Sequence, residues 1–348
     1  MAGAQLCHHA PPMPHTPGRS ELRALLALFA GALAIGSSGI FVRLSETGPT
    51  ATAFWRGCLA LPLLALWASL ERRGGSAARP AGAAALGVPA AARLLDPMFF
   101  WAGVFFAGDL ALWHASLLLT SIAASTLEAN CAPILVTLLA WALWGERPRL
   151  AFLAAIVLAF GGMLLILAPK LGGGSHALLG DALGLGTAVF YAAYLLAVAR
   201  LRARHGTGIV MFASTAVFTL LLLPLALLQR FLPVSAYGWW VLIGCAVTAQ
   251  VLGQGLIAYA LAHLPATFGA VGLYVQVVAA AIYAWLLLHE RLAPLQITGG
   301  VVVLAAIALA RRARRGPHEA AASSRAHPPP QPQRASIQSS VARQSDSR

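Results

Sequence analysis

Apolar stretches long enough to cross a lipid bilayer recur along this chain and constrain its fold more than any other feature. About 20 apolar residues are needed to span the roughly 30 Å of hydrocarbon in a bilayer. Ten stretches approach this length, at 22–43, 51–70, 97–119, 121–144, 150–169, 178–199, 208–229, 237–261, 266–288 and 293–310. Charged residues make up only 10% of the chain. The sequence therefore predicts an all-α integral membrane protein with ten transmembrane helices.

The segments at the two ends of the chain have little apolar surface to bury. Residues 1–20 and 312–348 are polar and rich in Pro, and we expect both to be disordered tails. The first apolar stretch follows the amino-terminal tail and is long enough to span, so we expect it to be a retained helix. Neither the four cysteines nor the histidines of the first tail form a spacing typical of a metal site. We expect no metal and no cofactor.

Basic residues are distributed unevenly between the loops, and loops rich in Lys and Arg stay in the cytoplasm. With the amino terminus inside, fifteen basic residues fall in inner segments: Arg19, Arg23, Arg72, Arg73, Arg79, Arg93, Arg147, Arg149, Arg200, Arg202, Arg204, Arg311, Arg312, Arg314 and Arg315. The outer loops hold three: Lys170, Arg230 and Arg291. This bias predicts a multi-pass protein of the cell's inner membrane with both termini in the cytoplasm. It also explains the net charge of +13 without a nucleic-acid partner.

The sequence repeats weakly at an offset of 144 residues. "WGERPRL" at 144–150 lies opposite "LHERLAP" at 288–294, so that Glu146 corresponds to Glu290 and Arg147 to Arg291. Each Glu-Arg pair is expected to stabilise a tight turn between two spans. The halves, residues 21–170 and 178–311, then contain five spans each. An odd number of spans places the second half upside down in the membrane, which is the inverted repeat of many secondary transporters.

Several motifs carry a resemblance to a known family. They are "FWR" at 54–56, "AGDLALWHASLLLTSIAAST" at 107–126, Pro133 followed by "GER" at 145–147, and "LGQGLIAYALAHLPATFGA" at 252–270 followed by "LLLHER" at 286–291. With the ten spans and the five-plus-five repeat, they resemble the EamA-type branch of the drug/metabolite transporter superfamily over about residues 22–311. The resemblance implies a secondary carrier, often an exporter of amino acids, related metabolites or toxic organic compounds. It also implies alternating access to a central cavity between the repeats.

One position departs from the pattern of that family. Val277 occupies the position of the second repeat that corresponds to Pro133, where such proteins commonly carry another proline. Because proline interrupts a helix, we expect the ninth span to be straighter than the fourth.

Four ionisable side chains lie inside apolar stretches: Arg56, Asp109, His114 and Glu128. With a rise of about 1.5 Å per residue, all four fall in the outer half of the bilayer. A charge at that depth costs at least about 2.5 kcal/mol, so each must face a partner or a wet cavity. We expect these residues to border a substrate or proton pathway, with Trp113 on the same helix face as Asp109.

The residues alone leave several roles open. Arg56 could bind substrate, form a buried ion pair with Glu128 or Asp109, or extend to the outer interface. His114 could relay protons or be a neutral core histidine. Glu128 and Asn130 are turned apart on one helix, and we expect Glu128 to face the cavity. Glu128 or Asp109 would then exchange a proton between the two states of a transport cycle, because burial increases the proton affinity of a carboxylate.

The second half contributes polar side chains without charge. Gln250 and Gln254 share a face of the eighth span, the ninth span offers Tyr274 and Gln276, and Tyr191 lies in the sixth. These amide and hydroxyl groups also suit a small polar solute. A cavity with one charged wall and one neutral, aromatic wall fits an amphipathic or zwitterionic substrate.

We therefore expect a secondary active transporter that exports a small polar or amphipathic metabolite by proton-coupled alternating access. Its partners would be the solute, protons and the lipid bilayer. A membrane receptor or scaffold is the alternative, although inverted repeats favour a carrier that opens to both sides. An intramembrane enzyme is less compatible with the sequence, since "HER" at 289–291 lacks the second histidine of a zinc-protease motif and His114 and Ser116 face different ways.

Overall fold

A computed structural model describes residues 19–73, 96–116, 118–119, 122–145, 148–168, 177–289 and 293–326. The turn residues Glu146, Arg147, Glu290 and Arg291 lie outside these ranges. Within them the regular structure is entirely helical. The predicted amino-terminal tail lies outside the described residues up to residue 18, and the predicted carboxy-terminal tail lies outside them from residue 327. Residues 312–326 are instead the end of the last helix, in a segment rich in the good helix formers Ala and Arg.

In its described residues the first half of the chain contains seven α-helices, of which the first two belong to one candidate span. Its helices are α1 (Arg19–Gly36), α2 (Ser38–Leu44), α3 (Pro49–Arg73), α5 (Met98–Ser116), α6 (Ile122–Ala129), α7 (Ala132–Trp144) and α8 (Leu150–Leu167). The second half contains α9 (Ala177–Arg202), α10 (Thr207–Leu227), α11 (Ala236–Cys245), the π-helix η2 (Ala246–Gln254), α12 (Gly255–Ala260), α13 (Ala266–Gly272), α14 (Val275–Leu288) and α15 (Pro294–Ala326).

The described residues contain nine helical spans that are long and apolar enough to cross a membrane. A shorter apolar helix, Leu127–Leu143, occupies the region predicted as the fourth span. Large apolar side chains such as Leu150 and Val157 on α8 and Val301 on α15 are exposed, as expected for a surface that faces lipid. The prediction of an all-α, multi-pass membrane protein is confirmed.

Two spans are interrupted at corresponding points. Between α6 and α7 the chain turns at Asn130 and Cys131, and Pro133 has no N–H to donate to the preceding turn. Between α13 and α14 it turns at Leu273 and Tyr274, although the corresponding proline is replaced by Val277. A break in the helix therefore occurs here without a proline, and the prediction that the ninth span is straighter than the fourth stays a prediction. The interruption forms because backbone N–H groups here bond three residues back, as in the bond from Tyr274 N to Val271 O at 3.1 Å.

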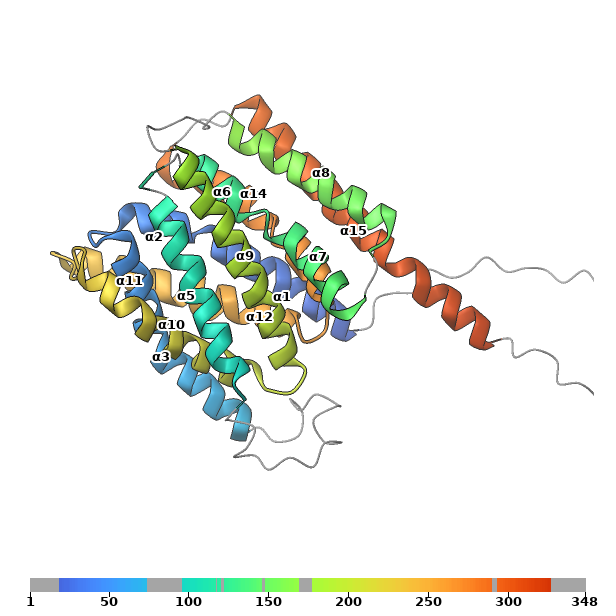
Figure 1. The fold of residues 1–348 in the computed structure, drawn as a ribbon, viewed down its shortest axis with the longest axis horizontal. Helices are drawn as coiled ribbons and strands as arrows, with labels where there is room; N and C mark the ends of the chain where they lie inside the picture. The colour runs from blue at the N-terminus through green and yellow to red at the C-terminus, as the bar shows by residue number, and fades with distance from the viewer. Residues whose placement is uncertain are drawn as a thin grey trace, which may run out of the picture.

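The helices pack as long side-by-side pairs (Figure 1). In Figure 1, α8 and α15 run together along one edge of the bundle, while α3 packs on α10 and α5 on α9. The α8–α15 crossing is very close, since a Cβ at Gly299 would lie 2.5 Å from the Gly162 carbonyl oxygen. Small residues at this crossing let the two backbones touch.

Candidate functional site

A cavity of about 770 Å³ lies where the interrupted spans meet. Its wall is formed by α1, α2, α3, α5, α7, α9, η2 and α14, together with the ends of α8 and α15. Cavities of about 300–1,000 Å³ with a few polar groups in a mostly apolar wall are typical of small-molecule sites. Predicted site residues that line this cavity are Arg56, Asp109, Trp113, Asn130, Tyr191, Gln254 and Gln276. Those that do not line it are His114, Glu128, Gln250 and Tyr274.

Arg56 extends from α3 into the wall and is only 7% exposed. Its Nε donates a hydrogen bond of 2.9 Å to Oε1 of Gln250, and the Nε2 of Gln250 donates at 2.9 Å to the Thr215 hydroxyl. The guanidinium also lies 5.6 Å from the centre of the Phe106 ring. Among the described residues no carboxylate comes within salt-bridge distance of Arg56. The buried ion pair considered from the sequence is therefore not formed, and the side chain does not extend to the interface.

Asp109 faces the same cavity from α5 and is 8% exposed. Within the described part of the chain its carboxylate accepts no hydrogen bond and forms no salt bridge. A carboxylate buried without a partner is costly, because it has lost its hydration shell without compensation. The cavity thus contains one buried basic side chain and one buried acidic side chain that are not paired with each other.

The two interrupted spans meet at the cavity through an amide pair. The Nε2 of Gln276, just after the start of α14, donates a hydrogen bond of 3.2 Å to Oδ1 of Asn130. Asn130 lies at the turn between α6 and α7, and both residues line the cavity. This bond joins the first half of the chain to the second at the point where both backbones bend.

Glu128 points away from the cavity and toward α9. A Cβ at Gly184, on α9, would overlap its Oε2. Asn130 therefore lines the cavity where the sequence favoured Glu128. The expectation assumed a continuous helix, whereas the turn at Asn130 changes the direction of the side chains around it.

An aromatic cluster from α5 and α9 borders the cavity through Phe106 and Tyr191. The rings of Tyr191 and Tyr194 stack with centres 6.0 Å apart, and Tyr194 stacks on Phe106 at 4.5 Å. Gln254 of η2 also lines the cavity. A π-helix inside a span is often found at functional sites. In this one Gln254 lines the cavity, whereas Gln250 does not line it and bonds to Arg56.

The other two predicted residues are buried in the protein. Tyr274 is fully buried, and its hydroxyl has no hydrogen-bond partner among the residues described. His114 is 3% exposed and lies next to Trp113, with ring centres 5.1 Å apart. Neither side chain reaches the large cavity.

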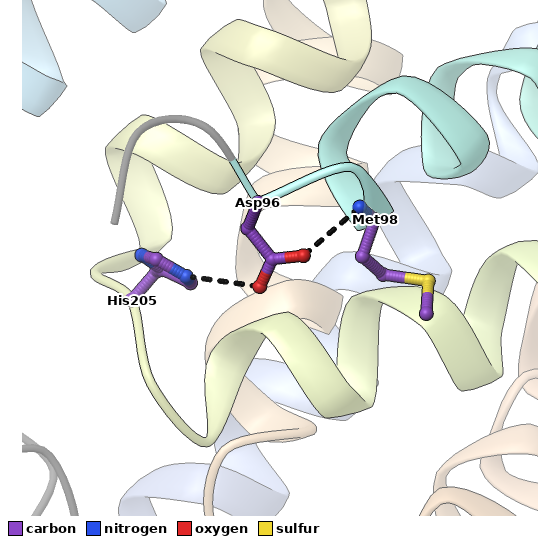
Figure 2. A network of polar contacts seen from close by, with 3 residues as sticks. All are labelled: Asp96, Met98 and His205. Atoms are coloured by element: carbon purple, nitrogen blue, oxygen red, sulfur yellow. Dashed lines mark hydrogen bonds and ion pairs between the residues drawn. The ribbon is translucent and has the colours of Figure 1, made fainter. Parts of the chain in front are cut away.

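A polar cluster joins the start of α5 to the loop after α9, and the sequence analysis did not identify it. Figure 2 shows its centre, where Asp96 Oδ2 lies 3.6 Å from His205 Nε2 and Asp96 Oδ1 accepts a 3.0 Å bond from Met98 N. Arg202 donates to the Ala258 carbonyl at 3.1 Å and also to the His205 carbonyl. We call Asp96, Arg202 and His205 the inner seal. Asp96 precedes a helix start, which is the pattern of a helix cap and could have drawn attention to it.

A second polar contact ties loops together at the other end of the bundle. Glu46 Oε2 accepts hydrogen bonds from Val234 N at 2.7 Å and Ser235 N at 2.9 Å, just before α11. The Ser235 hydroxyl donates to Oε1, and these bonds hold the pKa of the Glu46 carboxyl below its usual value. Burial opposes this shift but is outweighed.

Comparisons with known proteins agree with this architecture. The sequence pattern of the EamA-like transporter family matches residues 178–312. The pseudopaline exporter CntI of Pseudomonas aeruginosa is 31% identical over 217 residues, which cover 62% of this chain and 75% of the exporter. An uncharacterized transporter of Archaeoglobus fulgidus is 27% identical over 301 residues, 83% of this chain and 97% of that protein.

A solved crystal structure shares the fold. It superposes with a TM-score of 0.68 at 18% identity, covering 84% of this chain and 99% of that chain. Together with the multi-pass helical architecture, these likenesses confirm the family that the sequence motifs indicated. The chain belongs to the EamA-like transporter family of the drug/metabolite transporter superfamily.

Proposed function

We propose that this protein is a secondary active transporter that exports a small zwitterionic or amphipathic metabolite by proton-coupled alternating access. The observation that carries the proposal is the cavity itself, in which Arg56 and Asp109 are buried, unpaired and of opposite charge. The relative named a pseudopaline exporter supports export as the direction.

The proposed architecture is ten spans arranged as two inverted repeats, residues 21–170 and 178–311, with α6 and α7 together forming the fourth span. Two features support it. The turn at Asn130 lies 144 residues before the turn at Tyr274, which is the offset of the sequence repeat. The packing of the helices is also symmetric between the halves. Helix α1 packs on α12 of the second half, as α9 packs on α5 of the first half. The pairs α3–α10 and α8–α15 each join equivalent spans.

The proposed orientation has both termini in the cytoplasm of a cell whose inner membrane holds the protein. The cavity wall then includes the outer ends of spans, among them Arg43 of α2, Leu167 of α8 and Gln296 of α15. The inner seal lies at the cytoplasmic ends of α5 and α9. This conformation therefore corresponds to an outward-facing state, and transport requires the inner seal to open while the outer mouth closes.

The substrate is proposed to carry both an anionic and a cationic group. A carboxylate on the solute can pair with Arg56, and an ammonium can pair with Asp109, so that each buried charge gains a partner. Trp113 and Tyr191 offer aromatic surface to the rest of the molecule. A solute with only one charged group would leave either Arg56 or Asp109 unpaired.

Asp109 is proposed to exchange the coupling proton, because it alone of the two candidate carboxylates lines the cavity. Asp109 would bind a proton in one state of the transport cycle and the cationic group of the solute in the other. This exchange would link the movement of protons to the movement of the solute. Glu128 stays a second candidate, in a separate environment beside Gly184 of α9.

The proposal is tested by transport into proteoliposomes with an imposed pH gradient. The solutes are matched sets such as phenylalanine, phenethylamine and phenylpropionate, with leucine and tryptophan and their corresponding amines and acids. We expect a zwitterion to move faster than both of its singly charged analogues, and only when a pH gradient is imposed. Asp109→Asn should abolish the dependence on pH, and Arg56→Gln should abolish the preference over the amine.

The control is Arg200→Gln, which removes an exposed arginine that does not line the cavity. Proton coupling through these carboxylates is refuted if Asp109→Asn and Glu128→Gln both keep the rate of transport and its pH dependence.

A further inference from the structure

The three nitrogens of the Arg56 guanidinium have different surroundings. Nε is held by Gln250, as described above. Nη2 is buried and has no hydrogen-bond partner among the described residues. A guanidinium is always charged and can only donate hydrogen bonds, so Nη2 requires an acceptor that the neighbouring side chains do not supply.

A second buried atom nearby has the complementary need. Nδ1 of His114 is also buried without a hydrogen-bond partner in the described part of the chain. A second positive charge beside Arg56 would be repelled, so His114 is expected to be neutral. A neutral imidazole with its proton on Nε2 leaves a lone pair on Nδ1 that accepts a hydrogen bond.

Both side chains border one small cavity of about 10 Å³, which is separate from the large one. The hydroxyl-bearing residues Ser38 and Thr52 also border it. A single water molecule needs a cavity of roughly 10–15 Å³ and two to four polar partners. The small cavity therefore has the size of a one-water site, and the two nitrogens without partners belong to side chains that border it.

We infer that one internal water molecule occupies this small cavity and bridges Arg56 to His114. Its oxygen accepts a hydrogen bond from Nη2 of Arg56, and one of its protons is donated to Nδ1 of His114. Water meets both needs because it is a donor and an acceptor, whereas a metal ion would be repelled by Arg56 and a simple anion has no proton to donate to Nδ1.

The bridge makes His114, Gln250 and Thr215 positioning residues for Arg56. Gln250, itself bonded to Thr215, fixes the guanidinium at Nε, and the water fixes it at Nη2. Arg56 also lines the large cavity, where its charge can meet a substrate. All of these partners are neutral, so they orient the guanidinium without cancelling its charge. This role rests on the proposed function, in which Arg56 binds the anionic group of the substrate.

The water is tested directly by a crystal structure of the full chain in a lipid environment, at a resolution that shows ordered water. Density is expected within about 2.7–3.2 Å of both Nη2 of Arg56 and Nδ1 of His114. His114→Leu should lose that density and let the guanidinium rotate. Well-resolved side chains with no density between them would overturn the inference, whether or not the protein transports anything.

The positioning role is tested by kinetics with the solute that the proteoliposome assay identifies. His114→Leu should raise KM by about tenfold, the effect of losing one well-placed charge-assisted hydrogen bond, with little change in Vmax. His114→Asn, which keeps an acceptor near the position of Nδ1, should restore most of the affinity. Thr215→Val should act in the same direction and Thr215→Ser should not.

A double-mutant cycle separates this role from a general loss of structure. In an Arg56→Gln background, His114→Leu should change KM no further, because its effect passes through Arg56. Additive effects of the two substitutions would show that His114 acts independently and would overturn the positioning role. A protein that shows this non-additivity but no proton coupling would refute part of the proposed function and leave the bridge standing.

Discussion

Replacing Gly299 with alanine should force α8 and α15 apart. The added Cβ would lie 2.5 Å from the Gly162 carbonyl oxygen and 2.8 Å from Ile166 N. A carbon atom and a carbonyl oxygen approach to about 3.3 Å, so the two backbones must separate locally by roughly 0.8 Å. Both neighbouring atoms belong to backbone, which cannot rotate away as a side chain can. Overpacking of this kind costs about 1–3 kcal/mol.

The neighbouring glycine provides a matched control on the same helix. A Cβ at Gly300 meets only Val278, at an ordinary contact distance of 3.7 Å. Gly300→Ala should therefore keep the gain of about 0.8–1 kcal/mol that alanine has over glycine in a helix. Gly161→Ala serves the same purpose on α8, because a Cβ there meets nothing within 4 Å.

Thermal unfolding of the purified protein in detergent measures the difference. Since about 1 kcal/mol changes Tm by roughly 2–4 °C in chains of 150–250 residues, Gly299→Ala should melt several degrees below Gly300→Ala. The close crossing of the two backbones is disproved if Gly299→Ala melts at the same temperature as Gly300→Ala or above it.

Three further predictions concern the polar contacts at the ends and centre of the bundle. The pKa of Glu46 is lowered in the folded protein, so its hydrogen bonds contribute stability above the carboxyl's usual pKa and lose it as pH falls through the lowered value. Glu46→Gln should therefore lower Tm at neutral pH, and the difference from the unaltered protein should shrink in acid. Asp96→Asn weakens the contact with His205 and should speed labelling, from the cytoplasmic side, of a cysteine placed in the cavity; unchanged labelling would mean that this contact does not hold the seal. Gln276→Leu removes the bond to Asn130, worth about 0.5–1.5 kcal/mol, and should slow transport while leaving the protein folded, as checked by flux and Tm together.

The sequence predicted the spans well because each is a long signal averaged over many residues. The stretch predicted at 150–169 is the helix Leu150–Leu167, and the one at 208–229 is Thr207–Leu227. Five of the seven predicted residues that line the cavity carry a charged or amide group, and such a group inside an apolar stretch favours a position at a partner or a cavity. These inferences need only the chain's local composition.

What the sequence could not supply depends on how helices bend and rotate against one another. Asn130 lines the cavity in place of Glu128 because the chain turns at Asn130 and Cys131. The sequence argument assumed a continuous helix through both residues. The inner seal was missed because Asp96 and His205 come from loops far apart in the chain. Glu46 was missed for the same reason, since its partners lie about 190 residues away.

The separation of Arg56 from Asp109 is the feature that most favours a ligand over a purely structural role. If stability alone governed this layer, the cheapest arrangement would be a direct ion pair or two apolar residues, because an unpaired charge in the membrane costs at least about 2.5 kcal/mol. Instead the neutral side chain of Gln250 holds the guanidinium, and Asp109 faces the cavity without a partner. A solute that pairs with both side chains would offset the free-energy cost of leaving them unpaired in the empty cavity. Binding can then stabilise a closed state that the protein alone reaches only at a cost, which is the coupling that an alternating-access carrier requires.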